Sequence, residues 1–445
     1  SGISAQVSPL QVDTLKETKI PDQWDLQSCI NYAKEQNITI RKNRITAAST
    51  QIDVKTAKAA MFPSLSFSTG QQVVNRPYQE TSSRVSGSEI ISSNSKTSYN
   101  GNYGLNASWT LYNGNKRLKT IQQEKLNNQM AELDVATSEN NIQESITQVY
   151  IQILYAAESV KVNENTLQVS IAQRDRGQEL LNAGSIAKSD LAQLEAQVST
   201  DRYQLVTAQA TLEDYKLQLK QLLELDGENE MNIYLPALSD ENVLAPLPTK
   251  RDVYISALSL RPEIEASKLN VEASELGINI AKSSYFPTIS LSAGIGTNHT
   301  SGSDFTFGEQ VKNGWNNSIG LSVSVPIFNN RQTKSAVQKA KLQYETSMLS
   351  LLDEQKALYK TIESLWLDAN SAQQRYAAAN EKLKSTQISY ELISEQFNLG
   401  MKNTVELLTE KNNLLQAQQE QLQAKYMAIL NTQLLKFYQG DQLAL

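Results

Sequence analysis

The chain has 445 residues, and 41 Lys and Arg against 47 Asp and Glu give it a formal net charge of −6. No basic block breaks this acidic balance, so we expect no nucleic-acid partner. Mean hydropathy is −0.42, and no run of about 18 apolar residues predicts a transmembrane helix, although membrane strands, which alternate in polarity, stay possible.

The chain holds one cysteine, Cys29, and one histidine, His299. They leave too few ligands for a zinc or haem site, and one cysteine cannot form an internal disulfide. We expect Cys29 to fill apolar space and His299 to lie in a loop, "TNHTSGS". No Ser–His–Asp set, metal cluster or phosphate loop is apparent. The sequence therefore predicts no metal, no cofactor and no enzymatic activity.

The N-terminal stretch "SGISAQ" has two readings. Ser4 and Ala5 before Gln6 fit the small-residue end of a secretory signal, and a cloning scar or an ordinary tail fits equally well. Residues 1–24 are predicted to be an N-terminal tail.

An internal repeat organises the rest of the chain. "AAMFPSLSFSTG" (59–70) matches "SSYFPTISLSAG" (283–294) at a shift of 224, and "LNASWTLYNGNKR" matches "LSVSVPIFNNRQT" at a shift of 216. The second shift then holds without a gap through Gly184 and Gly400. The two shifts differ because one segment is longer in the first copy, and we expect that extra length to lie in a loop. We predict repeat 1 at 25–225, a linker at 226–249, repeat 2 at 250–436 and a C-terminal tail at 437–445.

Each repeat is predicted to place a short helix and two strands before a very long helix, a break and a return helix. The long helices are expected at 115–183 and 331–398, the turns at 182–189 and 398–405, and the return helices to about 225 and 436. Apolar residues recur in alternating steps of three and four, a heptad seam that runs from Ile362 to Phe397 and, in the first copy, from Ile146 to Leu167. Such helices would reach roughly 100 Å and must pack lengthwise against other helices.

The two breaks read "LLNAGSIAKSD" and "QFNLGMKNTVE". Gly184 and Gly400 supply the left-handed conformation that often ends a helix. Ser189 or Asp190, and Thr404, are candidate caps of the return helices. Both breaks are therefore predicted to be hairpin turns.

Four segments alternate with period two: about 63–75, 101–112, 287–297 and 317–328. One face is apolar and the other carries small polar side chains. This pattern fits a soluble sheet whose apolar face packs on a core, and it also fits a membrane sheet whose apolar face contacts lipid. Aromatic residues at the helix-side ends favour a membrane interface, namely Phe62, Tyr112, Phe286 and Phe328. The loops 75–100 and 297–316 are polar and expected in water. Four strands cannot enclose an aqueous lumen, and an open edge is costly in lipid, so if these are membrane strands the chain must oligomerise.

Taken together, the duplicated halves resemble the TolC family of outer-membrane efflux proteins. The resemblance is carried by "YFPTISLSAGIG", "SVPIFNNRQTKSAVQKA" and "FNLGMKNTVELL" with their copies in the first half. The family's helix-opening proline is Pro262 in repeat 2, but Ile38 stands there in repeat 1. The resemblance implies an α+β membrane protein of two tandem repeats. Three chains would form a homotrimer with a twelve-stranded β-barrel and a periplasmic helical barrel, with the linker near its equator.

The resemblance also implies the function: a passive, gated exit duct of a tripartite efflux pump in the outer membrane of a Gram-negative bacterium. Its partners would be a periplasmic adaptor, an inner-membrane pump and the lipid bilayer. A duct for type I protein secretion shares this fold, and a soluble coiled-coil scaffold is the alternative of another class. The family's paired acidic residues fit Glu406, whereas Thr409 holds the second position with Glu410 beside it.

Two sets of residues near the turns are candidates for function. The predicted gate and selectivity residues are Glu406, Glu410, Asp190 and Lys402, with Lys402 tying neighbouring hairpins. The predicted adaptor contacts are Asn182, Gly184, Ser185, Lys188, Asn398, Gly400, Met401 and Asn403.

Overall fold

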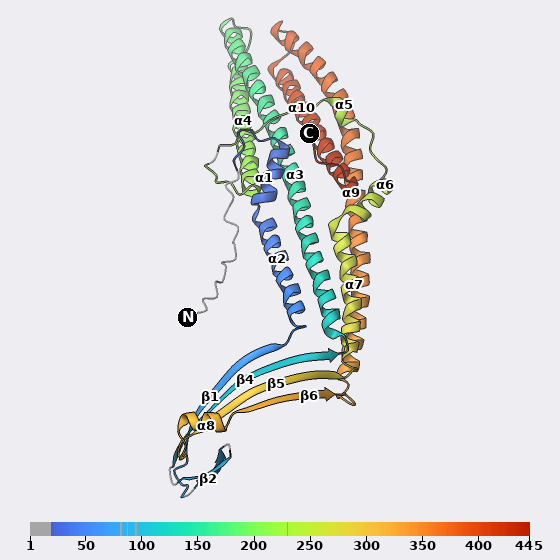
Figure 1. Cartoon of the computed structure of the whole chain (residues 1–445). Helices are drawn as coiled ribbons and strands as arrows, with labels where there is room; N and C mark the ends of the chain where they lie inside the picture. Colours follow the sequence, from blue (N-terminus) through green and yellow to red (C-terminus); the bar gives the residue numbers. More distant parts are fainter. Residues whose placement is uncertain (1–18, 81, 87, 94–95, 229) are drawn as a thin grey trace. The chain divides into compact units, whose positions relative to one another are not determined.

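A computed structural model describes residues 19–80, 82–86, 88–93, 96–228 and 230–445 (Figure 1). Ser4 and Ala5 lie outside the described residues. The chain divides into two compact units. The helical unit combines residues up to Ile45 with 132–265 and 352–445, and the strand unit combines 46–131 with 266–351.

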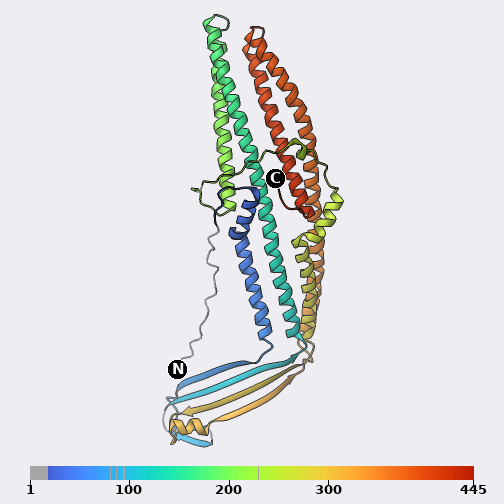
Figure 2. The same ribbon diagram turned by 45° about the horizontal axis from the view of Figure 1, so that its top comes forward.

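The strand unit contains one four-stranded antiparallel sheet. Its order is β1 (Ser64–Asn75), β4 (Thr97–Asn113), β5 (Thr288–Thr300) and β6 (Asn316–Ser324), and Figure 2 shows the four strands side by side. The central β4–β5 pair joins the two repeats. One cross-strand row is apolar, namely Leu65, Ala107, Ala293 and Ile319, and the next is small and polar, namely Ser64, Ser108, Ser292 and Gly320. The predicted alternation is therefore present across all four strands.

Three strand boundaries differ from those expected. β4 begins four residues before 101, and β5 runs three residues past 297, so His299 lies in a strand and not in a loop. β6 ends at Ser324 and not near 328, because Pro326 follows two residues later and has no backbone N–H to donate to a neighbouring strand.

Both loops between strands also contain elements that the sequence analysis missed. The first holds a hairpin of β2 (Ser82–Ser86) and β3 (Glu89–Ser93), and the second holds helix α8 (Phe307–Asn313). A complete capping box starts α8: the Thr306 hydroxyl accepts from the Glu309 N–H, and the Glu309 carboxylate accepts from the Thr306 N–H. These short elements carry too little periodicity to stand out in a polar loop.

The short helix expected before each first strand is broken in both repeats. Repeat 1 has α1 (Leu26–Gln36) and α2 (Ile38–Ala59), and repeat 2 has α6 (Lys250–Leu260) and α7 (Pro262–Ser283). Asn37 caps α2 by accepting hydrogen bonds from the Thr39 and Ile40 N–H groups, whereas α7 opens on a proline, which suits the first position of a helix. The two repeats thus reach the same break by different chemistry.

The long elements are α3 (Lys116–Asn182), α4 (Lys188–Leu222), α9 (Gln332–Asn398) and α10 (Thr404–Gln439). We call α3 with α4 the first hairpin and α9 with α10 the second hairpin. α10 continues three residues past 436 to Gln439 and is capped by Gly440, whose φ is +112°. Near the C-terminal end of the chain Tyr438 and Leu443 are buried, whereas residues 440–442 are exposed. The linker between the repeats carries the one-turn helix α5 (Asp240–Val243).

The heptad seam forms the core of the helical unit. Buried seam residues include Ile146, Ile153, Ile362, Ala369 and Tyr376. At the start of the return helix α10, Leu407 is fully buried and Val405 is 57% exposed. Burial of these apolar side chains, at about 25 cal/mol per Å² of area removed from water, holds the helices together.

Candidate functional site

The two hairpin turns share one backbone design. Gly184 and Gly400 have φ of +74° and +75°. In the first turn the N–H of Gly184 donates to the Leu181 carbonyl at 2.9 Å, and that of Ser185 to Leu180 at 2.8 Å. The second turn repeats both bonds at 2.9 and 2.8 Å. This is the Schellman arrangement, which needs a left-handed residue at the glycine position. The predicted left-handed glycines are therefore confirmed.

The starts of the two return helices differ from each other and from the expected caps. The cap of α10 is Asn403, not Thr404: its side chain accepts from the Glu406 N–H at 2.9 Å, and the Glu406 carboxylate accepts from the Asn403 N–H at 3.1 Å. Thr404 is the first helical residue and is buried. In α4 the cap position is Ala187, whose side chain accepts nothing, and Asp190 alone closes the turn by accepting from the Ala187 N–H at 3.0 Å.

The predicted gate residues fall into three places. Lys402 and Glu406 form an ion pair at 3.0 Å within one turn. Hydrogen bonds from the Asn403 backbone and from Lys402 lower the pKa of the Glu406 carboxyl. Glu410 accepts a hydrogen bond from the Ser389 hydroxyl of α9 at 3.1 Å. Asp190 belongs to the other hairpin.

The predicted adaptor-contacting residues are all exposed in the described chain. Asn182, Gly184, Ser185 and Lys188 surround the first turn, and Asn398, Gly400, Met401 and Asn403 surround the second. Met401 is 68% exposed, and Leu399, which the sequence analysis did not select, is 75% exposed. The sequence signal for Leu399 was available, since a large apolar side chain directly before a helix-ending glycine has little of its own helix to pack against.

A group of buried polar residues was not predicted. Lys411 of α10 donates hydrogen bonds to Asp201 of α4 and to Ser170 of α3. The side chains of Lys411 and Asp201 are only 4% and 2% exposed. Burial lowers the pKa of Lys411 and the adjacent Asp201 opposes that shift. In the sequence Lys411 lies in "TEKNN" and is indistinguishable from a solvated helix residue.

The apolar face of the sheet has no core against it in the described chain. Phe67 is 67% exposed, Ile319 78% and Leu321 65%. Of the predicted interface aromatics, Phe62, Phe286 and Phe328 are exposed and Tyr112 is half-buried. The alternative of a soluble sheet resting its apolar face on a core therefore finds no support here.

At the loop ends of the strands, His299 belongs to an aromatic cluster. Its ring stacks on Tyr103 with a centroid distance of 5.8 Å and meets Phe307 of α8 edge-on at 5.0 Å. Gly101, directly opposite in β4, is needed there, because a Cβ at that position would lie 2.1 Å from the His299 ring. The expectation of a bland loop residue was wrong for this histidine.

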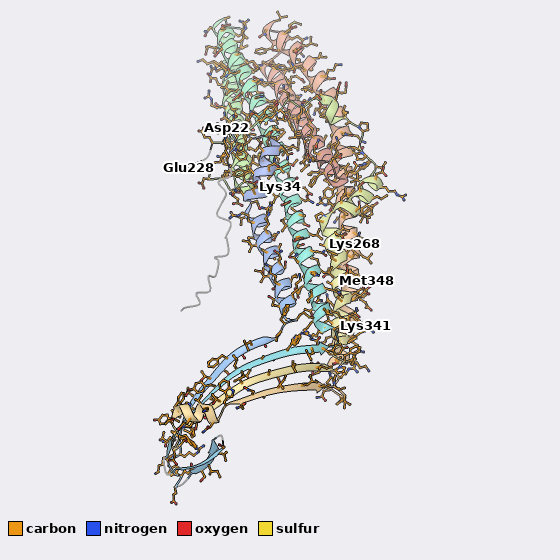
Figure 3. The ribbon with its side chains drawn as sticks, in the orientation of Figure 1. Asp22, Lys34, Glu228, Lys268, Lys341 and Met348 are labelled. Carbon is orange, nitrogen blue, oxygen red and sulfur yellow. The ribbon has the colours of Figure 1, made fainter. Side chains whose placement is uncertain are left out.

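The strand unit also presents apolar side chains from its helices. Leu342, Met348 and Leu349 on α9 are 61%, 46% and 66% exposed, and Figure 3 labels Met348 on this helix.

Cys29, in the helical unit, is fully buried as expected, and burial raises the pKa of its thiol to about 12. Among the described residues, no group of three or more His, Cys, Asp or Glu is arranged to hold a metal ion.

Comparison with known protein families matches both repeats. A family model described as "Outer membrane efflux protein" aligns with residues 29–224 and 253–440. The chain belongs to the outer membrane efflux protein family. Membership assigns it to the outer membrane of a Gram-negative bacterium and to a family of channel proteins. No helix in the described part of the chain is long and apolar enough to span a membrane.

Individual relatives are distant in sequence and similar in fold. Outer membrane efflux protein BepC of Brucella suis is 24% identical over 299 residues, which is 67% of this chain and 62% of BepC. Outer membrane protein TolC of Escherichia coli is 24% identical over 291 residues, 63% of this chain and 58% of TolC. The chain thus aligns with about three fifths of these relatives. The crystal structure of CusC superposes with a TM-score of 0.80 at 18% identity, over 96% of both chains.

Proposed function

We propose that the chain is the outer-membrane exit duct of a tripartite efflux pump, a passive and gated conduit from the periplasm to the exterior. The observation that carries this proposal is the open four-stranded sheet with an exposed apolar face, in a member of an outer-membrane efflux family. Lipid would cover that face. Copies of the chain would pair with the edge strands β1 and β6, because unpaired backbone groups are costly in a bilayer.

We further propose a homotrimer, which would close twelve strands into a barrel. The exposed apolar side chains on α9, Leu342 and Leu349 among them, support contacts between copies. The test is reconstitution of the purified protein into planar bilayers, with electrophoresis of unheated and heated samples alongside. We expect discrete channel conductance and a trimer band that disappears on heating. Recovery of the protein in the soluble fraction without detergent would instead favour the coiled-coil scaffold.

The periplasmic adaptor is proposed to contact the two turns, with the inner-membrane pump as the source of energy. Leu399 and Met401 supply exposed apolar area at the second turn, and such area is what a docking surface needs. The variant Leu399→Asp at the second turn and the variant Lys188→Gln at the first turn should each weaken binding of the cognate adaptor, measured by co-purification. The linker 226–249 is proposed to lie near the equator of the helical barrel.

Glu406 is proposed to act at the gate together with Lys402, Glu410 and Asp190. In a trimer the three copies of Glu406 would repel one another by roughly 3 kcal/mol per pair at about 6 Å and an effective dielectric near 20. Lys402, whose Nζ lies 3.0 Å from Glu406 Oε1 in the same chain, offsets part of the negative charge of Glu406. We therefore expect Glu406→Ala to lower cation selectivity in planar bilayers and Lys402→Ala to raise it. Equal selectivity in both variants and the wild type would contradict this role.

A further inference from the structure

A groove runs along the second hairpin between α9 and α10, which lie side by side (Figure 2). Its volume is about 530 Å³, within the range of pockets that hold drug-sized molecules. Met427, which is 45% exposed, lines the groove together with three buried alanines, namely Ala372, Ala379 and Ala424. The linker does not fill this space, because Gln373, which donates to the carbonyls of Val243 and Ala245, lies on the opposite side of α9.

The equivalent place in the first hairpin is filled by two tyrosines. At the repeat shift of 216, Ser371 corresponds to Tyr155 and Asn431 to Tyr215. Both tyrosines pack on the apolar core of the helical unit, and Tyr155 meets Tyr426 edge-on at a centroid distance of 6.3 Å. Burial and the neighbouring Tyr215 raise the pKa of Tyr155. The groove therefore exists where two aromatic side chains of the first repeat are replaced by a hydroxyl and an amide in the second.

Two polar side chains that line the groove lack partners. Asn431 is only 6% exposed, and its amide Nδ2 is buried with no hydrogen-bond partner among the described residues. Lys382 and Glu420 pair with each other at 2.9 Å, which leaves Arg375 as the lining cation without an ion pair in the described chain. Asp368 lies seven residues before Arg375, about 10 Å along the helix, and does not pair with it. The groove thus combines an apolar floor with two donors that have no acceptor.

We propose that the groove is a binding site for a small organic anion with a flat apolar ring system, such as an aromatic carboxylate. The rings would occupy the space that Tyr155 and Tyr215 fill in the first hairpin. The carboxylate would accept hydrogen bonds from Arg375 and Asn431, and a bond between two ionised groups is among the strongest hydrogen bonds in proteins. A cationic ligand is disfavoured, because both unpaired groups are donors. The site goes beyond the duct proposed above, which requires no bound ligand.

The test measures binding of 2-naphthoate to the purified full-length protein by equilibrium dialysis, with the same detergent in both chambers. We expect saturable binding of one molecule per chain. The uncharged analogue 2-naphthamide should bind about 10-fold more weakly, because it cannot form the charged hydrogen bond to Arg375. In Arg375→Gln the affinity for 2-naphthoate should fall by about 10-fold, and the two compounds should then bind equally.

A second pair of variants gives the groove the side chains of the first hairpin. Ser371→Tyr and Asn431→Tyr each introduce a residue that the duplicated unit already accommodates, and each should abolish binding of both compounds. The matched control is Lys384→Gln, which removes an exposed positive charge on the opposite side of α9 and should leave both affinities unchanged. Circular dichroism checks that every variant keeps its helices. If Asn431→Tyr does not, Ser371→Tyr and Arg375→Gln, at half-buried and exposed positions, still decide the question.

Two results would overturn the site. The first is 2-naphthoate binding to Ser371→Tyr or to Arg375→Gln as tightly as to the wild type. The second is the absence of saturable binding up to about 1 mM, which would indicate that a neighbouring copy of the chain, and not a small anion, fills the groove. Because dialysis requires no transport, a protein that binds the anion and forms no channel would overturn the duct and leave the site standing.

Discussion

The turns of the two hairpins have the same backbone conformation, but the return helices that follow them begin differently. Both turns use the same left-handed glycine and the same pair of backbone hydrogen bonds. The second begins α10 with charge and hydrogen bonds from Lys402, Asn403 and Glu406. At the positions of the first two, the first turn has Ile186 and Ala187. Duplication preserved the backbone and left the side chains free to diverge.

The first turn is stabilised by apolar packing. Ile186 and Leu191 stand at the two positions of a hydrophobic staple around the helix start. A Cβ added at Gly177 of α3 would lie 3.7 Å from each of them and 2.4 Å from Leu194. Gly177 thus permits close approach of α3 and α4, whereas repeat 2 has Ile393 in its place. The comparison shows one turn that is apolar and tight and another that is polar and charged.

The largest effect is expected from truncating the buried leucine in the first full turn of each return helix. Leu407 is fully buried and its repeat equivalent Leu191 is 9% exposed. Leu407→Ala should cost about 2–5 kcal/mol through lost burial and a cavity, and Leu191→Ala somewhat less. Hydrogen exchange of the backbone amides of α10 and α4 measures both. A larger loss at Leu191 would place the firmer anchor in the first hairpin and reverse the comparison.

The second-largest effect is expected from replacing Gly177 of the first hairpin by isoleucine, the residue at the equivalent position of the second hairpin. Gly177→Ile should destabilise the α3–α4 contact by about 1–3 kcal/mol, because the new side chain overpacks against Leu194. The matched control is Gly277→Ile in α7, where the nearest atom to an added Cβ is the Gln123 side chain at 3.7 Å. Thermal unfolding of the solubilised protein compares the two. A Gly177 variant as stable as the control would show that the close approach is not required.

Exchanging the caps should produce a smaller change of opposite sign in the two hairpins. Asn403→Ala removes the acceptor for the Glu406 N–H and should cost about 1 kcal/mol at the start of α10. Ala187→Asn supplies the missing acceptor in α4 and should stabilise that start by a similar amount. Amide exchange in the first turn of each helix is the measurement, and a destabilised α4 in Ala187→Asn would refute the equivalence of the two positions.

These differences mark what the sequence could and could not predict. The repeat, the long helices and the glycine turns follow from periodicity and from local backbone chemistry, which neighbouring residues determine. The cap of α10 was misplaced by one residue because Asn403 and Thr404 are adjacent and both suit a cap. The end of β6 was misplaced because alternation continues past Pro326.

The group of buried polar residues around Lys411 could not be predicted from the sequence, for a different reason. Ser170 and Lys411 are 241 positions apart and Asp201 lies on a third helix. Only packing brings them together, and each alone resembles a solvated residue on a polar helix. The same holds for His299, whose cluster depends on α8 folding against β5. Tertiary contacts between distant elements leave no periodic trace in one sequence.

The smallest expected effect is a pH dependence confined to the second turn. The hydrogen bonds from Asn403 and Lys402 lower the pKa of Glu406, so its stabilising effect is fully present above the ordinary Glu range and is lost as pH falls through the lowered value. Amide exchange at the start of α10, corrected for the intrinsic pH dependence of exchange, should therefore be constant at neutral pH and accelerate only in acid. In Glu406→Gln this acceleration should disappear, because the amide cannot titrate. If it persists there, the dependence arises from other carboxyl groups and the charged character of the second turn does not explain its stability.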